Sequence, residues 1–188
     1  MPHGARSSAR LEQGAFNPRV AGSNPAGPTV ERIERQAARL LVVTPEEQVL
    51  LLRLEPSFRD PFWVTPGGGL DDGETFVDAA RRELAEEVGR DDLPIGPCIW
   101  HRTVTFTWER WRVQQEERTF LVAAPGAFEA VTVHPDEEPI TGGAWFAVPA
   151  LRTLPEVVYP VGLADHVERL FKGGVPAEPI ALGDVVED

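Results

Sequence analysis

A run of three glycines, Gly67–Gly69, joins a short β-rich run to an acid-rich segment with helical periodicity, and this junction constrains the fold most strongly. The β-rich run is Phe62–Thr65, and a proline follows it. The segment Thr75–Val88 carries apolar residues at helical spacing, which predicts an amphipathic helix with one buried face. Glycines without side chains also let backbone groups approach an ion or a phosphate closely. A strand, a glycine loop and a helix in succession therefore predict a sheet covered by helices.

The sequence also marks the ends and the buried face of this helix. Thr75 suits the N-cap, and Asp78 stands three residues later in the place of a capping box. Gly89 suits the helix end. The expected buried stripe consists of Val77, Ala80, Leu84 and Val88.

The segments on either side predict a mixed domain. Further β-rich runs are expected at Gln36–Val43, Gln48–Leu54, Ile99–Thr107, Arg118–Ala123 and Ala144–Ala147. A second helix is expected at Val161–Phe171. The polar segment Trp108–Glu117 is expected to be a long hairpin loop. This order predicts the α+β class, with sheets covered by helices.

The two ends of the chain lack apolar periodicity. We expect residues 1–30 to be a disordered leader, residues 31–173 a folded domain and residues 174–188 a flexible tail, in which Ile180 and Leu182 could dock. A second hypothesis concerns the leader. The segment Gly22–Pro25 can be back-translated as GGT-TCG-AAT-CC, which resembles the T-arm of a transfer RNA gene. In that case the natural start would be a GTG codon at Val30, and both hypotheses stay open.

Charge and cysteine content exclude several classes of function. The formal net charge is -12, so the surface as a whole repels the phosphates of long nucleic acid. The single cysteine, Cys98, excludes an intrachain disulfide and fits a reducing cytoplasm. No apolar run approaches the roughly 20 residues that a membrane span needs. We therefore expect a cytoplasmic protein without a membrane partner.

Three glutamates are expected on one face of the predicted helix. Glu83, Glu86 and Glu87 stand at i, i+3 and i+4, where their carboxylates repel one another. A hard divalent cation such as Mg²⁺ or Mn²⁺ would convert this repulsion into binding and would share its shell with phosphates. Arg82 adjoins the cluster and could orient one glutamate. The alternative, for the helix alone, is a solvated acidic face.

The joint spacing of the loop and the helix is more specific than either part. From Gly68 the sequence reads a glycine, five residues, Glu74, seven residues and then RELAEEVG over residues 82–89. This resembles the Nudix box, G-x5-E-x7-R-E-U-x-E-E-x-G-U, in which U is a bulky aliphatic residue. The sequence departs from the box at Arg90, where Leu93 could supply the apolar contact instead. The likeness extends over about Ile33–Phe171.

The resemblance implies an α/β/α sandwich with a mixed β-sheet. It also implies hydrolysis of the diphosphate that joins a nucleoside to another group, with Mg²⁺ or Mn²⁺ as the cofactor. In this family, the residues that match Glu83, Glu86 and Glu87 bind the divalent ions, and the carbonyl at the position of Gly67 is often a further ligand.

The resemblance implies supporting roles as well. The arginine that matches Arg82 holds the first of the ligand glutamates, and the residue that matches Glu74 supports the site. We expect Gly68 and Gly69 to bind the substrate, and Trp108 to stack on a nucleobase or to pack in its hairpin.

The general base is not fixed by the sequence. The candidates are Glu86 or Glu87 acting directly, Glu138 or its neighbour Glu137, and, more weakly, Glu116 and Glu117. Glu138 precedes a predicted strand, where family members often hold a catalytic glutamate. The alternative for these loop residues is plain solvation.

The expected substrate is a small nucleotide, namely a nucleoside triphosphate, a nucleotide sugar or ADP-ribose. The alternative function is a non-catalytic Nudix-fold module that senses a nucleotide without cleaving it. The intact carboxylates of the box favour the hydrolase. The oligomeric state stays open, a homodimer included.

Overall fold

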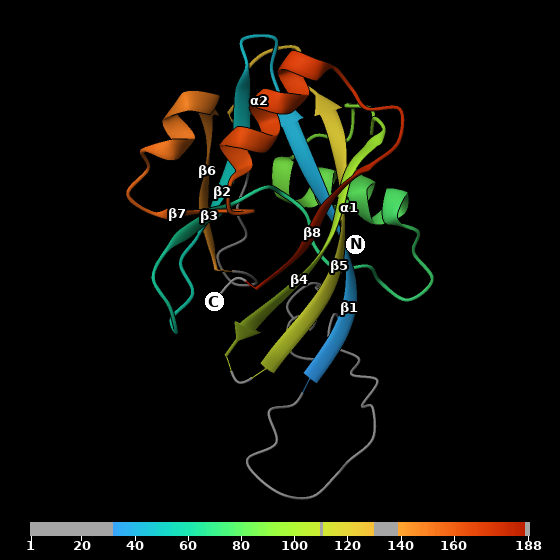
Figure 1. Ribbon diagram of the computed structural model, residues 1–188, viewed down its shortest axis with the longest axis vertical. Helices are drawn as coiled ribbons and strands as arrows, with labels where there is room; N and C mark the ends of the chain where they lie inside the picture. The colour runs from blue at the N-terminus through green and yellow to red at the C-terminus, as the bar shows by residue number, and fades with distance from the viewer. Residues whose placement is uncertain (1–31, 110, 130–138, 187–188) are drawn as a thin grey trace, which may run out of the picture.

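The computed structural model describes residues 32–109, 111–129 and 139–186, which form a curled mixed sheet with helices on both sides (Figure 1). In chain order the elements are β1 (Arg32–Val43), β2 (Gln48–Leu54), β3 (Phe62–Val64), α1 (Phe76–Val88), β4 (Cys98–Trp108), β5 (Trp111–Ala123), β6 (Ile140–Ala147), the 3₁₀ helix η2 (Val148–Arg152), β7 (Val157–Tyr159), α2 (Leu163–Gly173) and β8 (Ile180–Val186). The strands follow the order β7-β3-β2-β1-β5-β4-β8, and β6 pairs with β2.

Strand β1 is the centre of this arrangement. It runs parallel to β5 along its whole length, from the pair Arg32 and Arg112 to the pair Val43 and Ala123. It pairs with β2 only at Val43 and Val49. Because β1 and β2 diverge beyond this hairpin end, another segment of the chain can lie along that edge of β1.

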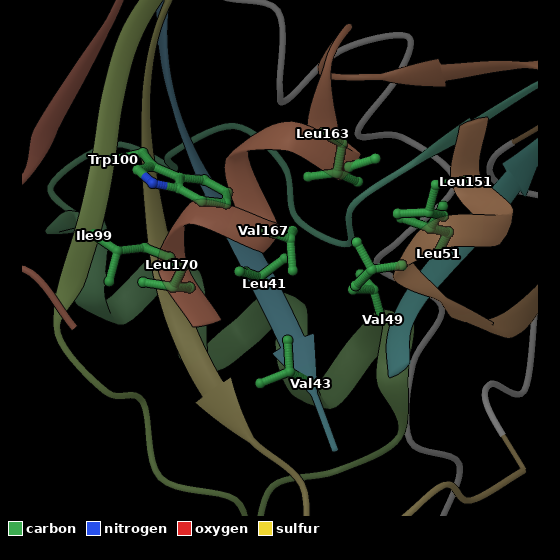
Figure 2. Packing of buried hydrophobic residues seen from close by; sticks show 12 residues of the cluster. Leu41, Val43, Val49, Leu51, Ile99, Trp100, Leu151, Leu163, Val167 and Leu170 are labelled. Carbon is green, nitrogen blue, oxygen red and sulfur yellow. The ribbon is translucent and has the colours of Figure 1, made fainter. Parts of the chain in front are cut away.

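Each face of the sheet carries its own apolar cluster, which confirms the predicted α/β/α sandwich. The α1-side cluster consists of Ala38, Leu40, Val42, Leu50, Ala79, Ala80, Leu84, Val88, Phe120, Val122 and Ala124. The α2-side cluster consists of Leu41, Val43, Val49, Leu51, Ile99, Trp100, Val148, Leu151, Leu163, Ala164, Val167 and Leu170 (Figure 2). Successive residues of β1 enter opposite clusters, as the period of two in a strand requires.

Helix α1 forms where the sequence predicts it. The Thr75 side chain accepts from the amide of Asp78, whose carboxylate accepts from the Thr75 amide, and Gly89 caps the other end in the left-handed region. The buried stripe differs from the predicted one, because Ala79 is buried while Val77 packs partly exposed against the α1-side cluster. Glu83 is buried as well.

The predicted hairpin loop at Trp108–Glu117 is wrong. Strand β4 continues to Trp108 and β5 begins at Trp111, so most residues of the expected loop belong to strands. The buried positions of β5 alternate through Val113, Gln115 and Glu117, which are 1%, 0% and 4% exposed. Two of these three buried residues are polar. Because buried polar residues break the usual alternation of apolar and polar side chains, the sequence did not indicate a strand here.

The C-terminal segment also differs from the expected flexible tail. Residues Ile180–Val186 form β8, which pairs in parallel with β4. Leu182 packs partly buried against the α2-side cluster, as its apolar character suggested, whereas Ile180 is 50% exposed.

The leader at residues 1–30 lies outside the described residues. Within the described ranges, no helix has both the length and the apolar surface that crossing a bilayer requires.

Candidate functional site

The glycine loop occupies the edge of β1 that β2 leaves open. The Leu40 amide donates to the Pro66 carbonyl at 2.8 Å. The Ala38 amide donates to the Gly68 carbonyl at 2.9 Å. The loop therefore lies against β1 like a short extra strand, and its position is fixed by the centre of the sheet.

The closeness of this contact explains the glycine at position 67. A Cβ there would lie 2.2 Å from the Ala38 carbonyl oxygen, and φ at Gly67 is 126°, which side chains rarely allow. The Gly67 carbonyl accepts from Arg39 Nη1 at 2.5 Å, and its amide donates to Glu87 Oε2 at 2.6 Å. The loop is thus tied to the last turn of α1 through a carboxylate.

Arg82 joins the loop, the start of α1 and the acidic face of that helix. Its Nε and Nη2 donate to both carboxylate oxygens of Glu74, at 2.8 and 2.9 Å. Its Nη2 also donates to the Gly69 carbonyl at 2.8 Å, and its Nη1 donates to Glu83 at 2.5 Å and to Glu86 at 3.2 Å. The hydrogen bonds with Glu74, and then the charge of Glu83, raise the pKa of Arg82. Its cation is therefore permanent and its position is fixed.

Two of the three helix glutamates face the glycine loop. The Glu83 carboxylate lies where the side chain of residue 68 would be, because a Cβ at Gly68 would be 2.4 Å from Glu83 Oε1. The Glu87 carboxylate accepts from the Gly67 amide. Glu86 lies beside them with its side chain 49% exposed. The loop and the helix thus bring together Gly67, Glu83 and Glu87, as the box predicts.

The donor set at this junction consists of carboxylate and carbonyl oxygens, which are the ligands that Mg²⁺ and Mn²⁺ prefer. The absence of a side chain at Gly68 leaves the room that the Glu83 carboxylate occupies. In the part of the chain that the structure describes, no group of three or more His, Cys, Asp or Glu side chains lies close enough together to hold a metal ion. Arg82 and the Gly67 amide hold the glutamates in their present positions.

A second ionic network lies in the sheet beneath Gly67. Glu117 Oε1 accepts from Arg39 Nε at 3.1 Å and from Gln115 Nε2 at 2.5 Å, and Glu117 Oε2 accepts from Arg102 Nε at 2.5 Å. Burial raises the pKa of Glu117, but Arg39 and Arg102 outweigh burial, so that its pKa is lowered. Glu117 is therefore a buried anion of strand β5. The prediction that it is a solvated loop residue is wrong.

The remaining candidates lie elsewhere. Glu138 and Glu137 are outside the described residues. Glu116 accepts from Gln36 at 2.9 Å and from Arg118 at 3.1 Å. These bonds place Glu116 in exposed pairs of the strand surface, away from the buried network.

Trp108 is distant from the glycine loop along the sheet. Its ring meets Phe58 edge to face, with the centroids 4.9 Å apart. In the register of β4 and β5, Arg102 pairs with Glu117 and Trp108 pairs with Trp111. Trp108 therefore lies about 20 Å further along β4 than Arg102, at roughly 3.3 Å per residue.

The departure from the box at Arg90 has a local explanation. The Arg90 guanidinium lies 4.6 Å from the ring centre of Phe128 and forms two hydrogen bonds of 2.6 Å with Asp92. Its flat cation covers an aromatic ring where an aliphatic side chain would pack. Leu93 packs partly buried against the α1-side cluster, as expected.

The sequence did not point to Arg39, whose side chain donates to the carbonyl of Gly67 in the glycine loop. Arg39 lies on β1 beside the apolar residues Leu40 and Leu41. An arginine inside an otherwise apolar strand is the signal that could have revealed it, because buried charges are paired.

Comparisons with known proteins show which sequences and folds this chain resembles. An RNA pyrophosphohydrolase from Wolbachia sp. subsp. Brugia malayi (strain TRS) is 32% identical over 88 residues, which are 43% of this chain and 55% of that protein. One from Wolbachia pipientis subsp. Culex pipiens (strain wPip) is 30% identical over 88 residues, which are 43% and 54%. The chain thus spans about half the length of these curated relatives.

Solved structures share the fold. The E. coli dihydroneopterin triphosphate pyrophosphohydrolase superposes with a TM-score of 0.56 at 22% identity, over 74% of this chain and 96% of that one. A MutT protein from Methanosarcina mazei Go1 gives 0.56 at 17% identity, over 79% and 100%. The family described as NUDIX domain matches residues 34–162, which is more than half of the sequence. With the box residues gathered at one loop, the chain therefore belongs to the NUDIX domain family.

Proposed function

We propose that this chain is a Mg²⁺-dependent hydrolase that cleaves the diphosphate linkage of a nucleoside diphosphate derivative. The observation that carries the proposal is the junction of loop and helix, where Arg82 binds Glu74, Glu83, Glu86 and the Gly69 carbonyl at once. These hydrogen bonds from Arg82 fix the acidic face of α1 against the glycine loop. Such a rigid, anionic junction suits metal-assisted phosphate chemistry.

Glu83, Glu86, Glu87 and the Gly67 carbonyl would hold the divalent ion. When bound, the ion supplies neutralisation of the phosphate charge and activation of a water molecule. Arg82 orients the carboxylates, and the bare backbone at Gly68 and Gly69 lets the phosphates approach. The candidates for the general base are Glu86, Glu87 and Glu138, of which Glu138 lies outside the described residues.

For the substrate, we propose a small nucleotide: a nucleoside triphosphate, a nucleotide sugar or ADP-ribose. The relatives named for RNA pyrophosphohydrolysis make a 5′-triphosphate end of RNA the second candidate. The net charge of -12 disfavours a long RNA, since its backbone would be repelled. Trp108, paired with Phe58, would contact only a substrate that extends far along β4.

A panel of these nucleotides and a short 5′-triphosphorylated RNA, each with Mg²⁺ or Mn²⁺, tests the proposal through released phosphate products. We expect turnover of at least one nucleotide that chelation by EDTA abolishes and Mg²⁺ restores. Glu87→Gln should lower kcat at least about 100-fold, because metal stabilisation of transition-state charge amounts to several kcal/mol. The matched control is Glu168→Gln on α2, whose carboxylate bonds Arg152 at 2.7 Å on the surface.

The outcomes separate the hydrolase from its alternative. Binding of a nucleotide without turnover across the panel would contradict the hydrolase and favour the sensing module. Full activity of Glu87→Gln would refute the metal assignment while leaving the hydrolase in place.

A further inference from the structure

Gly67 differs from its neighbours in what holds its backbone. The carbonyls of Pro66 and Gly68 accept from amides of β1, as in a sheet. Both backbone groups of Gly67 are instead bonded by side chains: the amide by Glu87 and the carbonyl by Arg39. The orientation of this one carbonyl therefore depends on a side chain of the sheet.

This dependence matters because the loop is made of glycine. A peptide between glycines has few steric preferences of its own, so hydrogen bonds decide which way its carbonyl points. Arg39 Nη1 lies 2.5 Å from the Gly67 oxygen. Without this donor, the Gly67 carbonyl would have more orientations open to it. The Gly67 amide lies in the preceding peptide, whose Pro66 carbonyl is held by the Leu40 amide.

Arg39 is in turn held by Glu117. Its side chain is 20% exposed, and its Nε donates to Glu117 Oε1 at 3.1 Å. Glu117 is fixed from two more sides, by Arg102 and by Gln115. A continuous chain of hydrogen bonds thus runs from the interior of β5 through Arg39 to the Gly67 carbonyl.

Stability alone does not account for such a network. Burying charges costs several kcal/mol per ion, and well-packed apolar residues of similar size often stabilise a fold as well or better. The strands β1 and β5 already pair along their whole length. What the apolar alternative cannot supply is a donor aimed at the Gly67 oxygen.

We propose that Arg39 and Glu117 are positioning residues that hold the Gly67 carbonyl in the orientation that divalent-metal binding requires. This inference rests on the proposed function, since it assigns a purpose to the same site. Neither residue needs to touch the substrate. They act as a supporting shell, whose loss in metal sites typically costs about 10- to 100-fold in metal affinity or activity.

The sign of the charge makes Arg39→Gln the decisive variant. Removing a positive charge near a cation site should strengthen cation binding if only Coulomb forces acted. Weaker binding of Mn²⁺ alone would therefore report lost positioning. The matched control is Arg53→Gln on β2: Arg53 is 27% exposed, bonds Glu156 at 2.7 Å and does not touch the glycine loop in the contacts that the described residues make.

We expect Arg39→Gln to weaken Mn²⁺ binding about 10- to 100-fold, measured by electron paramagnetic resonance of unbound Mn²⁺, and to lower kcat more than it raises KM. Arg53→Gln should keep the wild-type Mn²⁺ affinity. Unchanged Mn²⁺ affinity in Arg39→Gln, or an equal loss in both variants, would overturn the inference.

Two further variants guard against misfolding. Arg39→Lys keeps the charge but has no fork to bond Glu117 and Gly67 together, so an intermediate loss is expected and wild-type affinity would contradict the inference. In Glu117→Gln combined with Arg39→Gln, the losses should not add, because both act along one path; full additivity would count against it. A wild-type protein that binds Mn²⁺ but hydrolyses nothing refutes the hydrolase alone, because the Mn²⁺ comparison still stands.

Discussion

Replacing Gly68 by alanine places one methyl group in the space of a ligand carboxylate. The backbone of Gly68 does not lie in the left-handed region, so the main chain itself accepts alanine. The new Cβ would be 2.4 Å from Glu83 Oε1 and 2.9 Å from its Cδ. Relief therefore has to come from Glu83, whose carboxylate must leave its position.

The size of the movement follows from these distances. An ordinary contact begins at 3.4 Å, so Oε1 must retreat by about 1.0 Å, the difference between 3.4 and 2.4 Å. A retreat of that size can break the 2.5 Å hydrogen bond from Arg82. Glu83 is only 7% exposed, which leaves little room for it. We expect a loss of about 1–3 kcal/mol in the free energy of unfolding, the usual range for overpacking.

Urea unfolding and Mn²⁺ titration of the same samples measure the two consequences. Gly142→Ala on β6 is the control, because its Cβ would meet nothing within 4 Å, and it should be neutral or stabilising by about 0.4–1 kcal/mol. Adding Glu83→Asp, which shortens the side chain by one methylene, should restore stability to Gly68→Ala but not Mn²⁺ affinity. Wild-type stability together with wild-type Mn²⁺ affinity in Gly68→Ala would refute the reasoning.

Two other predictions concern the helices. Thr75→Ala removes the N-cap acceptor of α1 and should lower the free energy of unfolding by about 1 kcal/mol in urea, without changing KM; a cost near zero would show that α1 is held by packing alone. Burial, and then the charge of Arg169, lower the pKa of His166 below its usual 6.5, so the unfolded chain takes up this proton first. The contribution of His166 to the free energy of unfolding should therefore fall as the pH drops from 6.5 toward the native pKa, and stay constant above 6.5. His166→Gln should remove this part of the slope in unfolding curves between pH 5 and pH 7, and an unchanged slope would exclude His166 as its source.

The sequence was most informative where local rules and function coincide. Thr75, Asp78 and Gly89 define the ends of α1 through contacts within a few residues, and the structure confirms all three. The box likewise placed Glu83 and Glu87 against the glycine loop, because helix periodicity brings i and i+4 together. Their metal-binding role remains a prediction.

Reasoning from the sequence failed where polar residues are buried by partners far along the chain. Gln115 and Glu117 resemble loop residues in the sequence, yet Arg39 and Arg102 from other strands pair with Glu117. No local pattern encodes a charge pair whose members are 78 residues apart. The same holds for β8, whose partner strand β4 lies far earlier in the chain.

The sequence by itself thus determined the strand–glycine loop–helix junction, since its signals lie within one continuous stretch from Phe62 to Gly89. The tertiary structure decided what holds that junction in place. Only the pairing of β1 with β5 brings Arg39 and Glu117 together beneath Gly67. The physical reason is that capping and periodicity act over a few residues, whereas desolvated charges find their partners through the packing of the whole sheet.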